Sequence, residues 1–431
     1  MYAYESLLHR PILEKISDFE RNGRPLHSIF AQQFGRTTVE RICDTADRIR
    51  ILARMEKPFS HVQRDTDSGN RPGTFLSGLL SNKRAMLFFT QASTRTFLSF
   101  QAACQLLGIT CNEIRDPSLS SEVKGEHIMD SIRMFSTYFD TIIMRSKQPD
   151  LAERSAYLMN ELESVRGANV PIINAGSGAD EHPTQALLDI YTLRRIFRFQ
   201  DSGSGADESQ FLRLKEKCLQ EKGFELTKGI EEKTIAFVGD IGRGRTVRSL
   251  SQLLSLYRGV KLHFVAPEHE VLQLQPDLRR FLQNQGIHVQ EHSDVHEVLD
   301  IADAIYMTRI QREHDTADVS DFLANIPIDD FKRRFCMDMD KVRKMQEHAA
   351  ILHPFPRYGW DAKHERIPAE VEIPFEVDKD PRARYFDQAS NGMWVRSALI
   401  SYHFNADSII HDEFERLCPP EFQTYNRAVT G

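Results

Sequence analysis

One segment places three hydroxyl side chains and a guanidinium where an apolar run meets a helical pattern. Its residues are Ser93, Thr94, Arg95 and Thr96. A helix N-terminus offers unpaired backbone N–H groups and a positive dipole, and an arginine fork matches phosphate oxygens, so the segment could bind a phosphate. An ordinary Ser/Thr cap beside an exposed arginine explains the pattern equally well, because such caps are common.

A second segment, from His182 to Gln185, sets an imidazole and an amide at the start of another expected helix. Pro183 fits the first helical turn, where no backbone N–H is needed, so His182 stands just outside the helix. Both polar side chains would then face a cleft. A cap histidine with purely structural hydrogen bonds is the alternative, and it is the commoner outcome for a single histidine.

Arginines also follow four other short apolar runs, at Arg145, Arg245, Arg309 and Arg357. In open α/β sheets, ligands bind at the carboxyl ends of the strands, where these residues and Arg95 would gather. One such arginine is usually a surface residue, but five in a chain of net charge −7 indicate a small polyanionic substrate. The glycine-rich turn before Arg245 lacks the third glycine of the dinucleotide pattern, so an NAD-binding dehydrogenase is only weakly supported.

The elements that would position these side chains are short apolar strands that alternate with helical patterns. Helices are expected over 94–107, ended by Gly108, and over 246–257. Strands are expected at Ala85–Phe89, Thr141–Met144, Ile235–Val238, Leu262–Ala266, Ala304–Thr308 and Ala349–Leu352. Strands that alternate with helices form parallel sheets with crossover helices, so the predicted class is α/β.

The bulk composition limits the kind of protein. A chain of 431 residues fits two domains, and a net charge of −7 argues against general binding to nucleic acid or to a membrane surface. The six cysteines form no Cys-x-x-Cys pair, which disfavours a zinc site and a disulfide framework. The N-terminus has no apolar signal region and no run approaches ~18 apolar residues, so a cytoplasmic protein without a membrane segment is predicted.

Three segments stand outside the strand–helix pattern. Residues 200–228 carry few apolar anchors and are read as a surface insertion, with a flexible linker as the alternative. The first and last ~25 residues each hold a lone amphipathic stretch without strands and are expected to be appendages. Surface elaboration is the predicted role of the N-terminal extension and of the insertion.

Six motifs occur in an order that resembles the catalytic chain of aspartate carbamoyltransferase, in the aspartate/ornithine carbamoyltransferase superfamily. They read STRT, HPTQALLD, VGDIGRGRTV, YMTRIQRE, LHPFPR and DPRARYFDQASNGMWVRSAL. The resemblance runs from about Ser28 to Phe404, interrupted by residues 200–228 and by extra residues around 315–330. The ornithine branch carries His-Cys-Leu-Pro and Ser-Met-Gly motifs; this chain has His-Pro-Phe-Pro and no Ser-Met-Gly, which favours an acidic acceptor.

The resemblance implies two domains, each a parallel sheet flanked by helices, with the active site in the cleft between them and at the subunit interface. The implied parts are an extension at 1–27, a carbamoyl phosphate-binding domain at 28–184, an aspartate-binding domain at 185–384, a helix at 385–405 that returns to the first domain, and a tail at 406–431. The implied reaction moves the carbamoyl group of carbamoyl phosphate to the amine of L-aspartate, in pyrimidine biosynthesis. It needs no metal or other cofactor, and the implied assembly is a homotrimer without an indicated regulatory chain.

The resemblance also assigns roles to matching residues. The implied catalytic residues are Arg95, Thr96, Arg145, His182 and Gln185. The implied substrate-binding residues are Ser93, Thr94, Ser120, Lys124, Arg245, Arg309, Gln311 and Phe355. The 93–96 segment would hold the phosphate, and His182 would donate a hydrogen bond to the carbonyl oxygen as it becomes an oxyanion. Arg245, Arg309 and Gln311 would hold the two aspartate carboxylates, and Ser120 and Lys124 would complete the neighbouring subunit's site.

Four positions depart from the family pattern, and they depart in pairs. Gln91 stands where the family has a glutamate, and His314 stands where that glutamate's arginine partner is found. Phe97 and Gln101 replace an arginine and a glutamate one helical turn apart. Losing both ends of an ion pair costs far less than leaving one charge without its partner. We hypothesise that Gln91 and His314 share a neutral hydrogen bond when the domains close.

Two alternatives to the aspartate reaction stay open. One is carbamoyl transfer to a different acidic amine, which needs the same arginines. The other is a non-catalytic homologue that serves as an assembly subunit. The second is disfavoured because such a subunit has no need to keep anion ligands on separate strands.

Overall fold

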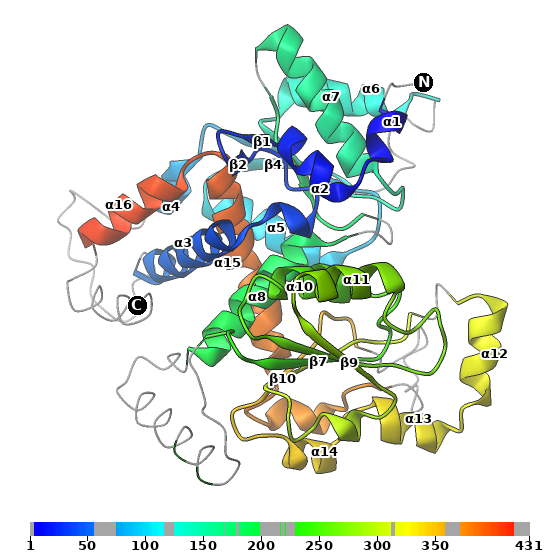
Figure 1. Cartoon of the computed structure of the whole chain (residues 1–431). Helices are drawn as coiled ribbons and strands as arrows, with labels where there is room; N and C mark the ends of the chain where they lie inside the picture. The colour runs from blue at the N-terminus through cyan, green and yellow to red at the C-terminus, as the bar shows by residue number, and fades with distance from the viewer. Residues whose placement is uncertain are drawn as a thin grey trace. The chain divides into compact units, whose positions relative to one another are not determined.

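The computed structural model describes residues 4–55, 75–115, 125–167, 169–177, 181–198, 216, 220, 229–311, 315–357 and 371–417. The chain divides into two compact units (Figure 1). Unit 1 comprises Met1–Leu188 and Ser390–Gly431, and unit 2 comprises Asp189–Ala389. Two helices, α8 (Pro183–Phe197) and α15 (Tyr385–His403), contain the points of division.

Unit 1 is built on a four-stranded parallel sheet of order β4-β3-β5-β6. Its strands are β3 (Arg84–Phe89), β4 (Thr110–Ile114), β5 (Thr141–Arg145) and β6 (Ile172–Asn174). Its other main helices are α3 (Arg36–Met55), α4 (Phe75–Leu79), α5 (Thr94–Leu106), α6 (Ile128–Tyr138), α7 (Leu151–Arg166) and α16 (Asp407–Leu417). Fully buried β5 lies next to β3 in the sheet, so the strand that ends at Arg145 cannot shift without disturbing the core.

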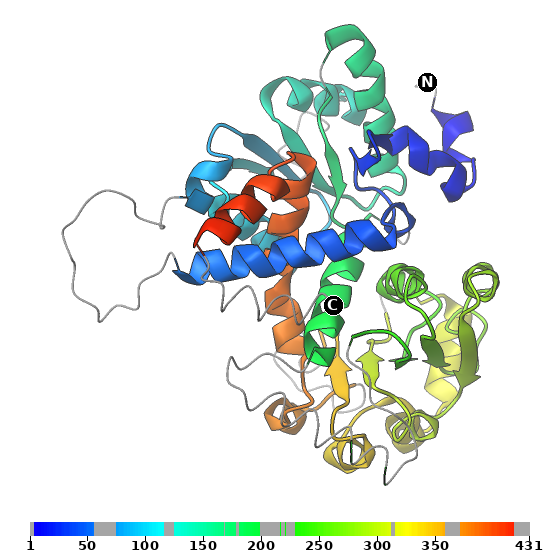
Figure 2. The same ribbon diagram turned by 60° about the vertical axis from the view of Figure 1, so that its left-hand side comes forward.

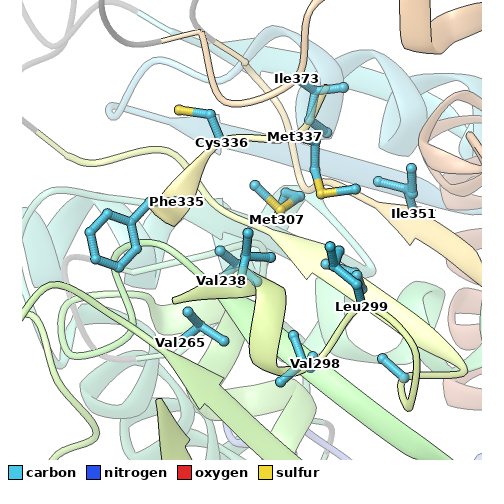
Figure 3. Packing of buried hydrophobic residues seen from close by; sticks show 14 of the residues in the cluster. Val238, Val265, Val298, Leu299, Met307, Phe335, Cys336, Met337, Ile351 and Ile373 are labelled. Carbon is cyan, nitrogen blue, oxygen red and sulfur yellow. The ribbon is translucent and has the colours of Figure 1, made fainter. Parts of the chain in front are cut away.

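Unit 2 is built on a five-stranded parallel sheet of order β11-β10-β7-β8-β9. Its strands are β7 (Thr234–Val238), β8 (Lys261–Val265), β9 (His288–His292), β10 (Ala304–Met307) and β11 (Ala350–Leu352). Its helices are α10 (Arg245–Leu254), α11 (Pro276–Asn284), α12 (Ala317–Asn325), α13 (Ile328–Phe335) and α14 (Met339–Lys344). On one face, Val238, Val265 and Met307 pack with side chains from outside the sheet such as Leu299 and Phe335 (Figure 3).

The predicted α/β class with two parallel sheets is confirmed. All six strands expected from apolar runs are present, and α5 begins at Thr94 as predicted. The three strands of these sheets that were not predicted are β4, β6 and β9. β4 and β9 lie at sheet edges, and both strands carry exposed residues on their two faces. Polar residues therefore interrupt their sequences, and neither strand forms an apolar run. β6 is only three residues long.

The expectation that the first ~25 residues form an appendage without strands is wrong. Glu20–Arg21 (β1) and Arg24–Pro25 (β2) pair antiparallel. Phe19 is fully buried, with its ring centroid 4.9 Å from that of Tyr157 on α7. The short helices α1 (Glu5–Leu8) and α2 (Ile12–Lys15) lie beside α7 in both views (Figures 1 and 2). The segment therefore belongs to the core of unit 1, because it supplies buried side chains that pack against α7.

A buried ion pair joins this segment to α7. Lys15 Nζ lies 2.8 Å from Glu153 Oε1, and the two side chains are 4% and 5% exposed. Lys15 Nζ also donates to the Leu8 carbonyl oxygen at 2.7 Å. Since a buried charge is tolerated only when it is paired and hydrogen-bonded, the pair specifies how the segment docks.

At the other end of the chain, α16 packs on α3 (Figure 2). The insertion at 200–228 lies outside the described residues except for Glu216 and Gln220. No helix among the described residues is long and apolar enough to cross a membrane. Within the same residues, no cluster of three or more His, Cys, Asp or Glu side chains could hold a metal ion.

Candidate active site

Each sheet has one point where the strand order changes direction. In unit 1 the chain forms β3, then β4 on one side of it, and then β5 on the other. In unit 2 the chain runs from β7 outward to β9 and then places β10 on the opposite side of β7. Loops that leave the carboxyl ends of strands diverge at such a switch point and leave room for a ligand. Most of the predicted site residues that the structure describes lie at the carboxyl ends of strands: Arg145 ends β5, and others follow β3 and β6 in unit 1 and β7 and β10 in unit 2, while Phe355 follows β11.

The 93–96 segment forms the N-terminus of α5. Ser93 is the N-cap in extended conformation, and its carbonyl oxygen accepts the Phe97 N–H at 3.2 Å. The Ser93 side chain makes no capping hydrogen bond. Thr94 and Arg95 are exposed while Thr96 is buried. The first turn of a 13-residue helix therefore presents backbone N–H groups, hydroxyls and a guanidinium together, which is the composition of an anion site.

Arg145 and His182 come together at the carboxyl end of β5. Arg145 Nη1 donates to the Ala175 carbonyl oxygen at 3.0 Å and lies 3.4 Å from His182 Nε2. Both side chains are buried. Because a guanidinium has no acceptor, His182 Nε2 accepts in this contact, and an imidazole protonated at Nε2 would instead supply a donor beside the guanidinium. A cation and an imidazole in such proximity suit the stabilisation of an oxyanion.

Gly176 makes this approach feasible. Its φ is +106°, a conformation that L side chains rarely adopt. A Cβ atom at this position would lie 2.6 Å from Arg145 Nη1 and 3.1 Å from His182 Cδ2. The glycine is therefore required both by the backbone conformation and by the closeness of the two functional side chains.

The loop that carries His182 is held by the chain segment just after the N-terminal extension. Asn174 Nδ2 donates to the Ile29 carbonyl oxygen at 3.0 Å, and Asn174 Oδ1 accepts the Gly176 N–H at 2.8 Å. The buried Glu181 carboxylate accepts the Ala31 N–H at 2.6 Å. These bonds fix both ends of the loop between β6 and α8, and so they orient His182.

In unit 2, the buried carboxylate of Asp240 joins the two loops at the switch point. Asp240 Oδ2 accepts the Gln311 backbone N–H at 3.1 Å, and the Asp240 N–H donates to Thr308 Oγ1 at 2.9 Å. Arg243 lies with Nη2 2.7 Å from Asp240 Oδ2. Gly239, whose φ is +115°, allows the close packing, since a Cβ there would lie 2.3 Å from the Thr308 carbonyl oxygen. Arg245 begins α10 directly after this loop, and Arg309 follows Thr308; both are half-buried.

Arg357 is a strand-end arginine that pairs with a carboxylate of its own unit. Its Nη1 and Nη2 lie 2.5 and 2.7 Å from the two oxygens of Asp378. Beside it, Phe355 has φ +50°, and its N–H donates to His353 Nδ1 at 2.8 Å, while His353 Nε2 lies 2.9 Å from Glu372. Both terminal nitrogens of Arg357 therefore already serve a carboxylate of unit 2, which argues against a role for this arginine in binding an anion.

The other predicted residues are placed as follows. Gln185 lies in the first turn of α8, three residues after His182, and its N–H donates to the His182 carbonyl oxygen at 3.0 Å. The Gln91 N–H donates to the Arg145 carbonyl oxygen at 3.2 Å. Phe97 is buried edge-on against Phe89, with ring centroids 5.4 Å apart. Ser120, Lys124 and His314 lie outside the described residues, and so does the hypothesised contact between Gln91 and His314.

Three supporting residues were not predicted: Glu181, Asp240 and Arg243. Asp240 and Arg243 stand inside the VGDIGRGRTV motif, whose alternating glycines signal close backbone packing. An acid in such a turn could have been read as an anchor for the loop. Glu181 precedes His182 directly, but its partner is a backbone N–H 150 residues away, which the sequence does not reveal.

Two family models match the chain. The model of the aspartate/ornithine carbamoyltransferase carbamoyl-P binding domain matches residues 27–195. The model of the Asp/Orn binding domain of the same family matches residues 231–403. The matched ranges include every predicted site residue, from Ser93 to Phe355.

Individual relatives agree with this match. Aspartate carbamoyltransferase 1, chloroplastic, of Pisum sativum is 34% identical over 86% of this chain and 77% of its own length. The aspartate carbamoyltransferase catalytic subunit of Methanosarcina acetivorans is 32% identical over 87% of this chain and 96% of its own.

Solved structures are similar as well. The catalytic subunit of M. jannaschii aspartate transcarbamoylase has 29% identity and a TM-score of 0.63, covering 88% of this chain and 98% of that one. Aspartate transcarbamoylase of Trypanosoma cruzi in complex with carbamoyl phosphate and aspartate has 28% identity and a TM-score of 0.63, covering 88% and 96%.

Proposed function

Because the chain belongs to the aspartate/ornithine carbamoyltransferase family, we propose that it transfers the carbamoyl group of carbamoyl phosphate to the amine of L-aspartate. The products are N-carbamoyl-L-aspartate and phosphate. The single observation that carries the proposal is the buried pair of Arg145 and His182, 3.4 Å apart at the end of β5. A guanidinium cation beside an imidazole suits a carbonyl oxygen that becomes negatively charged.

The chemistry requires positioning and charge neutralisation. The uncharged amine attacks the carbamoyl carbon, the carbonyl π electrons move onto oxygen, and the tetrahedral oxyanion collapses to release phosphate, which takes up the proton that the amine loses. Arg145 and His182 would stabilise the oxyanion, and the α5 N-terminus with Arg95 would hold the phosphate before and after the bond breaks. Donors that are fixed before the reaction need no reorganisation during it.

For the acceptor, we propose that Arg245, Arg309 and Gln311 bind the two aspartate carboxylates. Asp240 supports this role because it holds the loops that carry these residues against each other. A guanidinium fork binds a carboxylate through two parallel hydrogen bonds. Two arginines on separate loops would therefore select an acceptor whose two carboxylates match the spacing of the arginines.

Steady-state phosphate release from carbamoyl phosphate, measured with aspartate, glutamate and ornithine as acceptors, tests the proposal. We expect turnover with aspartate and at least ~100-fold lower kcat/KM with ornithine, because its side-chain cation would face Arg245 or Arg309. An Arg145→Ala variant that keeps its fold should lose activity. Turnover with another acidic acceptor alone would replace aspartate, and no turnover with any acceptor would favour an assembly subunit.

We further propose a homotrimer in which Ser120 and Lys124 complete the neighbouring site. Mixing inactive Arg95→Ala and Lys124→Ala subunits should restore partial activity, because some hybrid trimers contain one site with both residues intact. Subunit exchange without any recovery would contradict a shared site. A cytoplasmic location and a place in pyrimidine biosynthesis belong to the same proposal, and cell fractionation together with rescue of a pyrimidine-requiring strain would test them.

A further inference from the structure

One guanidinium lies between two carboxylates in unit 2. Arg243 Nη2 is 2.7 Å from Asp240 Oδ2, and Arg243 Nη1 is 2.7 Å from Asp315 Oδ1. The Arg243 side chain is 13% exposed, and the Asp240 and Asp315 side chains are 0% and 5% exposed. Contacts between ions that are largely removed from water are screened less than surface pairs, so this cluster differs from an ordinary salt bridge.

The cluster joins the segment that follows β7 to the segment that follows β10. Arg243 lies between β7 and α10, two residues before Arg245. Asp315 lies in the connection from β10 to α12, four residues after Gln311. Gln311 is tied to the same place, since its Nε2 donates to the Arg243 carbonyl oxygen at 3.2 Å. Both the side chain and the backbone of Arg243 are therefore bonded to the connection that follows β10.

Arg243 is poorly placed to bind a substrate itself. Its Nε donates to Asp240 Oδ2 at 2.9 Å, and its Nη1 donates to Asp315 Oδ1 at 2.7 Å. A guanidinium whose donors already serve two carboxylates has little capacity left for a third. Any effect of Arg243 on substrate binding is therefore indirect and passes through its contacts with the loop that carries Arg309 and Gln311.

We propose that Arg243 is a positioning residue that sets the affinity for the dicarboxylate acceptor by bridging Asp240 to Asp315. This inference rests on the proposed function. Removal of the cation would leave two carboxylates facing each other with little water between them. The loop after β10 would then move away from the loop after β7, and the spacing of Arg245 from Arg309 would change. The phosphate segment at 93–96 belongs to the other sheet, in unit 1, so the change should fall on the acceptor.

The test compares Arg243→Gln, Asp315→Asn and the double variant by steady-state kinetics. We expect Arg243→Gln to raise the KM for aspartate ~10-fold or more while the KM for carbamoyl phosphate stays within about twofold of the wild-type value. Asp315→Asn should raise it less, because an amide oxygen can still accept a hydrogen bond from Arg243. The double variant should be no worse than Arg243→Gln, since residues of one network are not additive. Arg243→Lys should recover only part of the affinity, because an ammonium cannot span two carboxylates as a planar fork does.

Arg248→Gln is the matched control. Arg248 lies on the helix α10 that follows the same loop and makes a two-point contact with Asp277, at 2.7 and 3.1 Å, but on an exposed surface. This variant should leave both KM values unchanged.

The outcomes separate two kinds of failure. Equal changes in both KM values, or a lowered melting temperature with an unchanged aspartate KM, would assign Arg243 a purely structural role and overturn the inference. A wild-type protein that releases no phosphate with any acceptor would instead refute the proposed function.

Discussion

Replacing Gly176 with alanine should lower catalysis in addition to stability, whereas the same change at a control glycine should lower stability alone. The new Cβ would lie 2.6 Å from Arg145 Nη1. Restoring an ordinary contact of about 3.5 Å requires a movement of about 0.9 Å. The easiest atom to move is the end of the flexible arginine side chain, but that atom is the one that lies 3.4 Å from His182 Nε2. A misplacement of about 1 Å at a reacting centre lowers the rate roughly 100-fold, or about 2.7 kcal/mol in the activation free energy.

The assay is kcat/KM for both substrates together with the free energy of unfolding in urea. Gly167→Ala is the matched control, because Gly167 has φ +71° but a Cβ added there would meet no atom within 4 Å. Both variants should lose on the order of 1–3 kcal/mol of stability from backbone strain. Only Gly176→Ala should lose activity. Equal kcat/KM values for the two variants would refute the argument that Gly176 exists to let Arg145 approach His182.

Three further predictions concern the supports of unit 1. Lys15→Met should destabilise the fold by about 3–5 kcal/mol because it leaves Glu153 buried and unpaired, whereas Lys15→Met with Glu153→Leu should be close to neutral; urea titration compares them, and equal losses would contradict the buried pair. Glu181→Ala removes the acceptor for the Ala31 N–H, so it should lower the unfolding free energy by about 1–3 kcal/mol and should also lower kcat. Full activity would show that this bond does not orient the loop that carries His182. Burial lowers the pKa of His27 from 6.5 to about 3, so the unfolded chain takes up this proton first as the pH falls. The stability contributed by neutral His27 is present above about pH 6.5 and is lost as the pH falls towards 3, and His27→Gln should flatten the dependence of the unfolding free energy on pH in that window.

The central strands could be predicted from the sequence because burial on both faces leaves a continuous apolar run, as in Thr141–Arg145. β4 and β9 could not, since an edge strand with exposed residues shows the same composition as a loop. The N-terminal segment was misjudged for a related reason. Its buried side chains are scattered among charged residues, and their partners lie on α7, more than ~100 residues away in the sequence.

In the candidate site too, the residues within a sequence motif could be predicted, whereas their partners from distant parts of the chain could not. Strand-end arginines are visible in the sequence because a motif places them at the right spacing. Their partners are not visible, because a carboxylate elsewhere in the chain decides whether a guanidinium is available to a ligand. Arg357 illustrates this point: the sequence groups it with Arg309, and only the structure reveals that Asp378 neutralises it.

The buried Asp407 carboxylate connects the two ends of the chain. It accepts hydrogen bonds from Arg24 at 2.8 Å and from Arg41 at 2.5 Å, and Arg24 also stacks on the Tyr402 ring at 3.8 Å. Arg24 precedes the first family match, which begins at residue 27, and Asp407 follows the second, which ends at residue 403. The Asp407 carboxylate thus fastens a segment before the first matched range to a helix after the second. Because Arg41, inside the first matched range, binds the same carboxylate, replacement of Arg24 would leave Asp407 with one of its two cations, whereas replacement of Asp407 would remove the shared partner of both.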